Sequence, residues 1–324
     1  MRTLLAVVAA GLGLVAVVTT APALVGLSTT AGVAHAVALR GPGALALAVA
    51  AVVLGLVARR RRGGRVAGGL AALLAACAVV HVGVLVLRGV DGRAPGPEAD
   101  LVVVALNTEV DGVSPEQLAD LVEAVGADVV ALPETPATVA AAMAAAVDAR
   151  TGQRWSALTE AVDERPIAAT SLLVADRLGA LERVGAPALE LSAVAARTDA
   201  APLVVAAHPP PPIPGRFPMR EWAAQGRTAV RACAVPGAVV AGDLNATLDH
   251  APLRDGLDAG PCVDAAEAAG AGGLGTWPAS LPPLLAAPID HVLVDARAWE
   301  PLTADVVRVG GTDHRAVVVG LARR

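Results

Sequence analysis

The sequence predicts two parts of different fold class: an all-α apolar anchor over residues 1–88 and an α/β domain over residues 100–324. A mean hydropathy of +0.61 and 55% hydrophobic residues are too high for a wholly soluble protein, yet 17% of the residues are charged. From about residue 100 onward, apolar runs of strand length alternate with helical patterns, as is typical of α/β folds.

The charged residues divide at the same place. Residues 1–99 hold two acidic residues and nine arginines, and the chain contains no lysine. Residues 100–324 hold 28 acidic residues and 16 arginines, which gives this part a formal charge of −12. A surface of that sign does not attract polyanions in general, so a broad nucleic-acid-binding role is excluded.

Three apolar runs, at residues 4–27, 44–58 and 67–87, predict three transmembrane helices, because a span needs about 20 residues. The second run reaches that length when residues 37–43 extend it. Arginines fill the short loop 59–65, and such loops stay cytoplasmic. We therefore expect a multi-pass plasma-membrane protein with its N-terminus inside, an outer loop near residues 28–40, and everything after the third span outside.

Two features of the anchor have a second interpretation. The first run is also compatible with a cleavable signal peptide, because Ala21-Pro22-Ala23 is rich in small residues; the proline and the length favour a retained span. His81 within the third run is either functional or a histidine at a helix–helix contact, and the second interpretation is simpler. Residues 89–99 predict a Gly/Pro linker, which reaches at most about 36 Å and keeps the outer domain near the bilayer.

The outer domain begins with a predicted β-α-β unit. Buried strands are expected at residues 101–106 and 128–132, and the helix between them begins after Ser114 in a capping box and stops at Gly126. A second helix follows over residues 137–149. Because parallel strands bring their carboxyl ends together, the polar residues just beyond these ends, Asn107 and Glu134, are expected side by side.

The middle of the chain predicts further strands at residues 168–175, 188–195 and 202–207. The last of these ends at His208, and four prolines then hold that histidine at a rigid corner. A lone histidine at a strand end is more often a surface residue than a catalyst. A helix is expected over residues 217–234.

The stretch Gly242-Asp243-Leu244-Asn245 carries the strongest chemical signal. A short buried strand is expected at residues 238–241, and Asp243 and Asn245 follow it two residues apart. Strand alternation sends both side chains to one face, at the sheet edge where ligands of open α/β sheets bind. Together they can orient a water molecule or share a hard metal ion; the alternative is a plain turn.

The C-terminal part adds a candidate histidine. Helices are expected at residues 250–257 and 263–269, and strands at 288–294 and 316–321. Asp290 lies at the start of the first of these strands, and Asp313-His314 follows a Gly-Gly turn just before the second. The pair is either a turn or a source of a titratable imidazole that Asp290 orients.

These polar residues occur in a fixed order, each at a strand end: Asn107, Glu134, His208, Asp243, Asn245, Asp290, Asp313 and His314. With Gly-Asp-Leu-Asn, Ile-Asp-His and Thr-Asp-His-Arg, the set resembles the endonuclease/exonuclease/phosphatase superfamily over residues 100–324. The resemblance implies a four-layer α/β sandwich of two packed mixed sheets that hydrolyses a phosphoester with Mg²⁺, or with Mn²⁺ or Ca²⁺. The chain has no tyrosine, so the active-site tyrosine of some branches is missing.

The resemblance also implies a role for each residue. Glu134 is similar to the principal metal ligand, with Asn107 beside it and Asp313 assisting. Asp243 is similar to the acid that positions or deprotonates the attacking water, with Asn245 as its partner.

The two histidines have roles on the phosphate. The resemblance implies that His314, held by Asp290, stabilises charge in the transition state. It implies that His208 binds a non-bridging oxygen or protonates the leaving group. Whether Asp243 or His314 is the general base stays open at this point.

The leading hypothesis is therefore a membrane-tethered, extracytoplasmic phosphoester hydrolase, expected to be a monomer. The rival is a catalytically inactive ligand-binding or sensor domain on the same fold, which would not need every polar position. The substrate is either a phospholipid or other envelope phosphoester, or extracellular nucleic acid. An oxidising compartment permits a disulfide between Cys233 and Cys262, the alternative being two free thiols, and Cys77 has no obvious partner.

Overall fold

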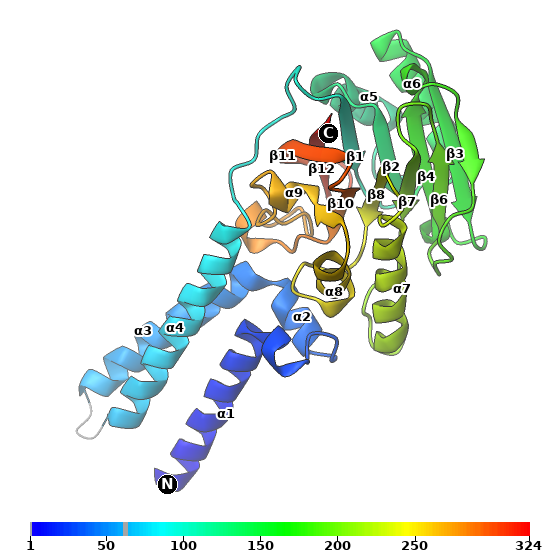
Figure 1. Cartoon of the computed structure of the whole chain (residues 1–324). Helices are drawn as coiled ribbons and strands as arrows, with labels where there is room; N and C mark the ends of the chain where they lie inside the picture. The colour runs from blue at the N-terminus through cyan, green and yellow to red at the C-terminus, as the bar shows by residue number, and fades with distance from the viewer. Residues whose placement is uncertain (1, 61–63) are drawn as a thin grey trace.

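The computed structural model describes residues 2–60 and 64–324. Two six-stranded mixed sheets pack face to face, helices cover their outer faces, and a group of apolar helices projects from one end (Figure 1). The α/β sandwich of two mixed sheets that the resemblance implied is confirmed.

The first sheet has the order β11-β12-β1-β2-β4-β3. Only β1 and β2 are parallel neighbours, as the β-α-β prediction requires. The strands are β1 (Leu101–Ala105), β2 (Val129–Pro133), β3 (Trp155–Ala161), β4 (Ala169–Ala175), β11 (Trp299–Arg308) and β12 (Arg315–Arg323).

The second sheet has the order β5-β6-β7-β8-β10-β9, and here β7 and β8 are the parallel pair. Its strands are β5 (Glu182–Val184), β6 (Ala193–Arg197), β7 (Leu203–Ala207), β8 (Ala238–Asp243), β9 (Cys262–Asp264) and β10 (Asp290–Asp295). In both sheets the parallel pair lies near the centre, so the carboxyl ends of β1, β2, β7 and β8 supply the loops of one edge.

Helices form the two outer layers. On the first sheet lie α5 (Pro115–Val125) and α6 (Ala137–Thr151), and beside the second lie α7 (Met219–Ala232) and α8 (Ala251–Ala259). The short α9 (Ala265–Ala268) packs at the side of the sandwich, against β10 of the second sheet and β11 of the first. The capping box is confirmed, because Ser114 Oγ accepts the N–H of Gln117 while Gln117 Oε1 accepts the N–H of Ser114. Gly126 ends α5 in the left-handed conformation at φ 65°. Single 3-10 turns complete the domain: η2 (Pro166–Ala168), η3 (Asp176–Leu178) and η4 (Pro283–Leu285).

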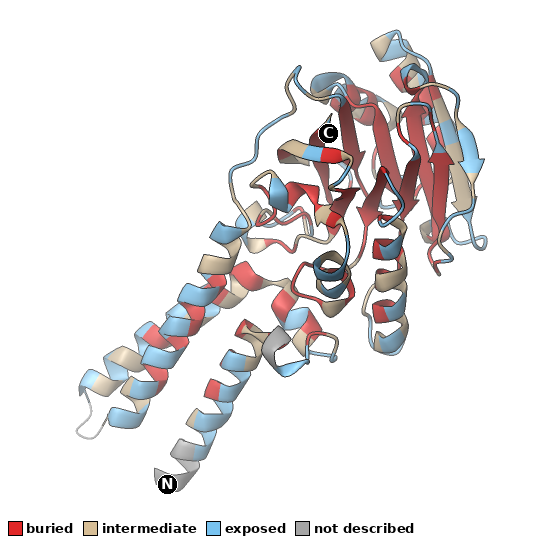
Figure 2. Cartoon of the chain, in the orientation of Figure 1, coloured by how far each residue is buried: buried red, intermediate tan, exposed pale blue. Residues whose placement is uncertain are grey.

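Three clusters of buried apolar side chains hold the layers together. One lies between the sheets and includes Val103 and Val239; a second lies under α5 and α6, and a third under α7 and α8. Figure 2 shows the central strands of both sheets buried, the edge strand β3 partly exposed and the projecting helices largely exposed. The strand prediction worked where strands are buried on both faces, because such strands appear as continuous apolar runs.

The strands that the sequence failed to predict are β3, β5, β9 and β11. These four are the outermost strands of the two sheets. Edge strands are partly exposed and short or interrupted; β11, for example, contains Pro301 at a register shift. The predicted helix at 263–269 is β9 followed by α9, and residues 188–192 lie outside any strand, because β6 begins at Ala193.

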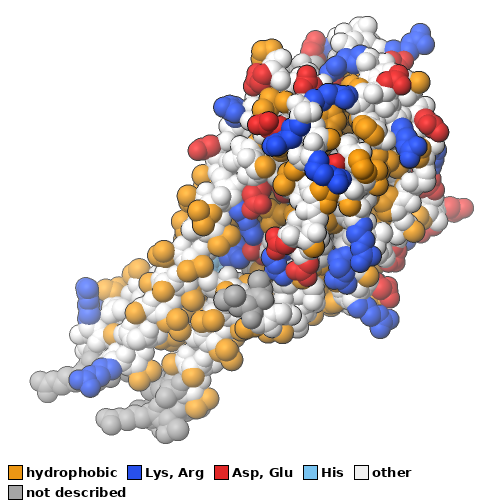
Figure 3. Space-filling view, viewed as in Figure 1, with side chains coloured by type: hydrophobic (Ala, Val, Ile, Leu, Met, Phe, Trp, Pro, Cys, Tyr) orange, Lys and Arg blue, Asp and Glu red, His pale blue; other side chains and the backbone are white. Residues whose placement is uncertain are grey.

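The N-terminal part consists of α1 (Arg2–Thr20), η1 (Pro22–Val25), α2 (Val33–Ala38), α3 (Arg40–Arg60) and α4 (Arg65–Leu87). Two of these, α3 and α4, are long and apolar enough to cross a membrane, and Val7–Thr20 is a shorter apolar helix. Figure 3 shows apolar side chains over the projecting helices and most acidic and basic side chains over the sandwich. The predicted cytoplasmic loop 59–65 includes residues 61–63, which lie outside the described residues.

The structure joins Cys233, at the end of α7, to Cys262, at the start of β9, in a disulfide bond whose Cα atoms are 6.0 Å apart. Cys77 in α4 is a buried free cysteine. The bond staples the helical layer of the second sheet to the edge strand of that sheet.

We expect the unreduced protein to contain one alkylatable thiol, from Cys77, when it is denatured and analysed by mass spectrometry. The Cys77→Ser variant should contain none. Because the bond closes a loop between residues 29 apart, its loss in Cys233→Ser should lower the free energy of unfolding by roughly 3–4 kcal/mol. Three alkylatable thiols in the wild-type protein would contradict the bond.

Candidate active site

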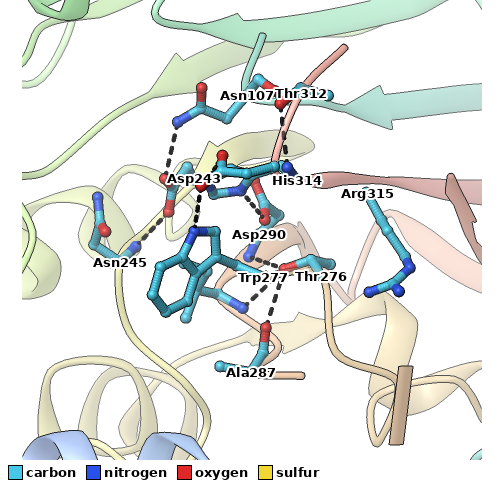
Figure 4. A network of polar contacts seen from close by, with 12 residues as sticks. Asn107, Asp243, Asn245, Thr276, Trp277, Ala287, Asp290, Thr312, His314 and Arg315 are labelled. Carbon is cyan, nitrogen blue, oxygen red and sulfur yellow. Dashed lines mark hydrogen bonds and ion pairs between the residues drawn. The ribbon is translucent and has the colours of Figure 1, made fainter. Parts of the chain in front are cut away.

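The structure brings the residues selected from the sequence to one edge of the sandwich. A cleft of about 530 Å³ is lined by seven of the eight: Asn107, Glu134, His208, Asp243, Asn245, Asp313 and His314. The eighth, Asp290, lies directly behind His314 (Figure 4). They come from the ends of strands in both sheets, so the packing of the two sheets assembles the cluster.

Asp243 is at the centre of the cluster and its position depends on the glycine before it. A Cβ at Gly242 would overlap the carbonyl oxygen of Ala207 on the neighbouring strand β7, and Gly242 has φ 145°. Glycine therefore lets β8 lie close to β7 where Asp243 enters the cleft. The carboxylate of Asp243 is buried and accepts hydrogen bonds from the N–H of Asn245 at 2.8 Å and from Asn107 Nδ2 at 3.1 Å.

Asn245 reaches the cleft for a different reason from the one predicted. Strand alternation does not place it, because β8 ends at Asp243 and Asn245 adopts a left-handed conformation at φ 50°. Its Nδ2 donates to the carbonyl oxygen of Pro209 at 3.0 Å, which ties the turn after β8 to the proline run after β7. Asn245 therefore lies beside Asp243 in the cleft as expected, but a turn after β8 places it there and not strand alternation.

Glu134 and Asn107 lie side by side at the ends of β2 and β1, as expected. Asn107 Nδ2 donates to Glu134 Oε1 at 3.1 Å and also to Asp243, so one amide bridges two carboxylates. Glu134 adopts φ 56°, and left-handed conformations of residues other than glycine cluster at functional sites. Burial raises the pKa of Glu134, and the charge of Asp243 adds to this, against the hydrogen bond from Asn107.

His314 is held between carboxylates. Its Nδ1 donates to Asp290 Oδ2 at 2.8 Å, while its Nε2 lies 3.8 Å from Asp243 Oδ2. Burial alone would lower the pKa of His314, but the charge and hydrogen bond of Asp290 raise it to about 10, so the imidazole is protonated at neutral pH. The predicted pairing of Asp290 with His314 is present.

His208, in contrast to His314, is neutral at neutral pH. Its Nε2 lies 3.7 Å from Asp243 Oδ2 and 3.9 Å from Glu134 Oε1, and the side chain is fully enclosed. Burial lowers the pKa of His208 to about 4, although the charge of Asp243 opposes this, so the ring is neutral. The histidine is thus part of the cluster and not a surface residue at a strand end.

Asp313 is the most exposed of the predicted residues. One oxygen accepts the Nε1–H of Trp277 at 2.7 Å, and the other lies 3.7 Å from His314 Nε2. Trp277 itself lines the cleft and is 38% exposed. This tryptophan is a site residue that was not predicted, although Thr276-Trp277-Pro278 follows a Gly-rich loop in the sequence.

The cluster has the composition of a site for a hard cation. Asp243, Asp290 and His314 each offer one ligand atom, all within 4.8 Å of one another. The buried Asp243 and the half-buried Glu134 accept hydrogen bonds from the same amide, and burial and the charge of Asp290 also raise the pKa of Asp243. A divalent cation beside these oxygens would compensate the charge that raises both pKa values, so the donors fit Mg²⁺, Mn²⁺ or Ca²⁺.

One wall of the cleft comes from the N-terminal part, which the sequence analysis did not foresee. The outer loop expected near residues 28–40 contains α2, and this segment contributes Ala34, His35, Ala38 and Leu39 to the lining. A six-residue helix flanked by glycine and leucine has no distinctive sequence pattern. Its place depends on contacts with residues more than 170 positions further along the chain.

Asp249 fixes this wall. It accepts paired hydrogen bonds from Arg40, at the start of α3, and from Arg88, just after α4. Burial would raise the pKa of Asp249, but the bonds from the two arginines lower it to about 2. The next residue, His250, donates from Nε2 to the carbonyl oxygen of Ala34 in α2 at 2.9 Å. Asp249 and His250 together therefore contact α2, the start of α3 and the residue after α4.

The comparisons with known proteins agree with this geometry. The sequence profile of the Endonuclease/Exonuclease/phosphatase family matches residues 104–314. No curated protein matches the chain in sequence.

Solved structures show the same fold. An endonuclease/exonuclease/phosphatase family protein from Leptotrichia buccalis superposes with a TM-score of 0.52 at 10% identity, covering 68% of this chain and 99% of its own. A functionally unknown conserved protein from Enterococcus faecalis gives 0.51 at 9% identity, covering 69% and 100%. The catalytic domain of human Nocturnin, solved with a bound sulfate anion, gives 0.51 at 14% identity, covering 69% and 94%.

We expect Asp249→Ala to destabilise the full-length protein in detergent, because it leaves the buried Arg40 without its carboxylate and Arg88 with Glu267 alone, at 3.5 Å. Removing one partner of a buried ion pair costs about 3–5 kcal/mol, which corresponds to a fall in melting temperature of roughly 6–20 °C for a domain of this size. The matched control is Asp255→Ala on α8, where the aspartate is 56% exposed; its melting temperature should change by less than about 2 °C. Equal melting temperatures for the two variants would show that the cluster does not join anchor and domain.

Proposed function

The chain belongs to the endonuclease/exonuclease/phosphatase family, and on that premise we propose that it is a divalent-metal-dependent phosphoester hydrolase, tethered to a membrane with its cleft outside the cytoplasm. The observation that carries the proposal is the cluster itself: Glu134, Asp243 and His314 line one cleft together with His208, and Asp290 supports His314 from behind. A purely structural role gives no reason to gather buried carboxylates whose charges oppose one another.

We assign the cation to the oxygen-rich side of the cluster. Glu134 is the principal ligand, Asn107 orients it, and Asp313 approaches from the rim. When bound, the cation supplies a Lewis acid that neutralises developing charge on a phosphoryl oxygen. Asp290 is not assigned as a ligand, because it lies behind His314 and does not line the cleft.

The proton chemistry is assigned to Asp243. The N–H of Asn245 and the amide of Asn107 hold its carboxylate from two sides, which fixes the direction of its lone pairs. It therefore positions the attacking water and accepts its proton, with Asn245 as the second group that orients the water. This proposal resolves the choice of general base in favour of Asp243.

The two histidines are assigned different roles on the phosphate. His314, flanked by Asp290 and Asp243, presents a protonated Nε2 that offsets negative charge in the transition state. His208 lies on the other side of Asp243 and, through Nε2, contacts a phosphoryl oxygen or the leaving group. One cationic and one neutral imidazole around one carboxylate can provide both charge stabilisation and hydrogen bonding.

The membrane part of the proposal is supported by α3 and α4, by the largely exposed apolar surface of the helices, and by the arginines at the ends of α3 and α4 that lie away from the domain. We propose α1 as a third span. The Cys233–Cys262 bond is of the kind that persists in oxidising compartments, which supports a domain outside the cytoplasm.

We expect full-length protein in detergent to hydrolyse at least one member of a phosphoester panel, and Asp243→Ala or His314→Ala to lower kcat by about 10²–10⁴-fold without unfolding the domain. EDTA should abolish turnover and Mg²⁺ or Mn²⁺ should restore it. Asp120→Ala on α5, whose aspartate is 60% exposed, is the control and should retain wild-type rates. Activity that survives chelation would remove the metal from the mechanism, and ligand binding without any turnover would support the inactive alternative.

The topology makes a separate prediction in living cells. A reporter enzyme that is active only outside the cytoplasm, fused after Arg324, should be active, and a cytoplasmic reporter at the same position should be silent. Fusions within residues 61–63 should give the reverse pattern, because arginine-rich loops stay inside. An active cytoplasmic reporter after Arg324 would overturn the orientation.

A further inference from the structure

Outside its polar cluster the cleft is lined mainly by apolar side chains, although Glu109, Arg216, His35 and His250 also line it. Its lining includes Leu39 from the anchor and five large side chains from the domain: Ile167, Leu191, Ile213, Phe217 and Ile289. These side chains offer a charged or strongly hydrated group no partner, whereas a hydrocarbon chain is stabilised in proportion to the apolar area that it buries. The volume of about 530 Å³ is within the range of small-molecule pockets.

The α2 wall lies at the end of the anchor where the apolar helices meet the domain. The chain leaves α1 at Thr20, forms α2, and enters α3 at Arg40, while α4 ends next to the domain at Leu87 (Figure 1). His35 Nε2 donates to the carbonyl oxygen of Pro212 at 2.7 Å, which closes α2 against the proline run. In the proposed topology the cleft wall is therefore at the outer surface of the bilayer.

Exposed apolar side chains of the domain support the same orientation. Six large ones are exposed between residues 100 and 324: Val162, Ile213, Val235, Trp277, Leu281 and Leu284. Ile213 and Trp277 line the cleft, and the backbone of Leu284 contacts Gly41 at the start of α3. An apolar rim thus extends from the cleft to the first turn of a candidate span.

We infer that the substrate is an amphiphilic phosphoester, whose phosphate lies at the Asp243 cluster while its hydrocarbon chain occupies the apolar part of the cleft beside α2. The inference rests on the proposed function and specifies its substrate class. A lipid of the outer leaflet reaches the cleft along the apolar rim without passing fully into water. Water-soluble phosphoesters and nucleic acid lack the part that this wall binds.

The test compares two diesters with the same leaving group, para-nitrophenyl hexadecyl phosphate and para-nitrophenyl ethyl phosphate, on full-length protein in lipid nanodiscs with Mg²⁺. In both, water adds to phosphorus, the phosphorus–oxygen bond to the aryl group breaks, and para-nitrophenolate leaves, so one absorbance reports both rates. We expect kcat/KM to be at least about tenfold higher for the hexadecyl ester. A tenfold ratio equals about 1.4 kcal/mol, less than burial of a few methylene groups supplies.

Two variants locate the hydrocarbon chain. Ile213→Asp places a charge in the cleft and should reduce the hexadecyl-to-ethyl ratio by about tenfold. Val162→Asp is the matched control, because Val162 is 49% exposed against 43% for Ile213 and does not line the cleft; its ratio should equal that of the wild type. A wild-type ratio near one, or equal ratios for the two variants, would overturn the inference while leaving phosphoester hydrolysis intact.

A second readout does not depend on turnover. A hexadecyl phosphodiester with a diazirine at the end of its chain is photolysed on the Asp243→Asn variant, and the cross-linked peptides are mapped by mass spectrometry. We expect labels on residues 33–39 and 211–217. Labels confined to α1, α3 and α4 would show only that the probe dissolves in the bilayer and would overturn the inference. If neither ester is hydrolysed with any cation but the cleft is labelled, the proposed function fails and the lipid site stands.

Discussion

The buried ion cluster of Asp249 with Arg40 and Arg88 is the interaction on which the arrangement of the cleft depends. The three side chains are between 6% and 13% exposed, so their charges interact with little screening by water. Because Arg40 begins α3 and Arg88 follows α4, one carboxylate fixes two helices of the anchor. Asn245 lies in the same short segment between β8 and α8, so the N-terminal helices and the polar cluster are positioned by residues close together in the sequence.

Within the cleft, the negative charge of Asp243 lies beside the positive charge of His314. Asp243 has a protonated imidazole on one side and a neutral one on the other, and His314 is protonated because Asp290 lies behind it. Removing either aspartate would therefore change the pKa of His314, and removing Asp243 would also change that of His208. The coupling joins the two sheets, because Asp243 and Asp290 lie on β8 and β10 of the second sheet, whereas His314 directly precedes β12 of the first.

Much of the site could be predicted because its residues follow buried strands. Asn107, Glu134, Asp243 and His314 each stand where an apolar run stops or starts, and parallel strands bring such ends together. The four edge strands escaped prediction, because a half-exposed strand such as β3 lacks a continuous apolar run. The α2 wall and the role of Asp249 were not predicted for another reason. Both depend on contacts between residues more than 160 positions apart, and a local sequence pattern does not predict such contacts.

The proposed tether changes what the family fold can select. When the protein and its substrate are held in the same bilayer, the substrate diffuses within a thin layer instead of through solution. This raises the effective concentration of the substrate at the cleft. For a polyanion in solution the anchor offers no such gain, and the −12 charge of residues 100–324 opposes approach. The α2 helix adds a steric reason, because its His35 contacts Pro212 of the proline run and the two segments together form a wall of the cleft. Tether, charge and wall thus favour the same class of substrate, although each arises from a different part of the sequence.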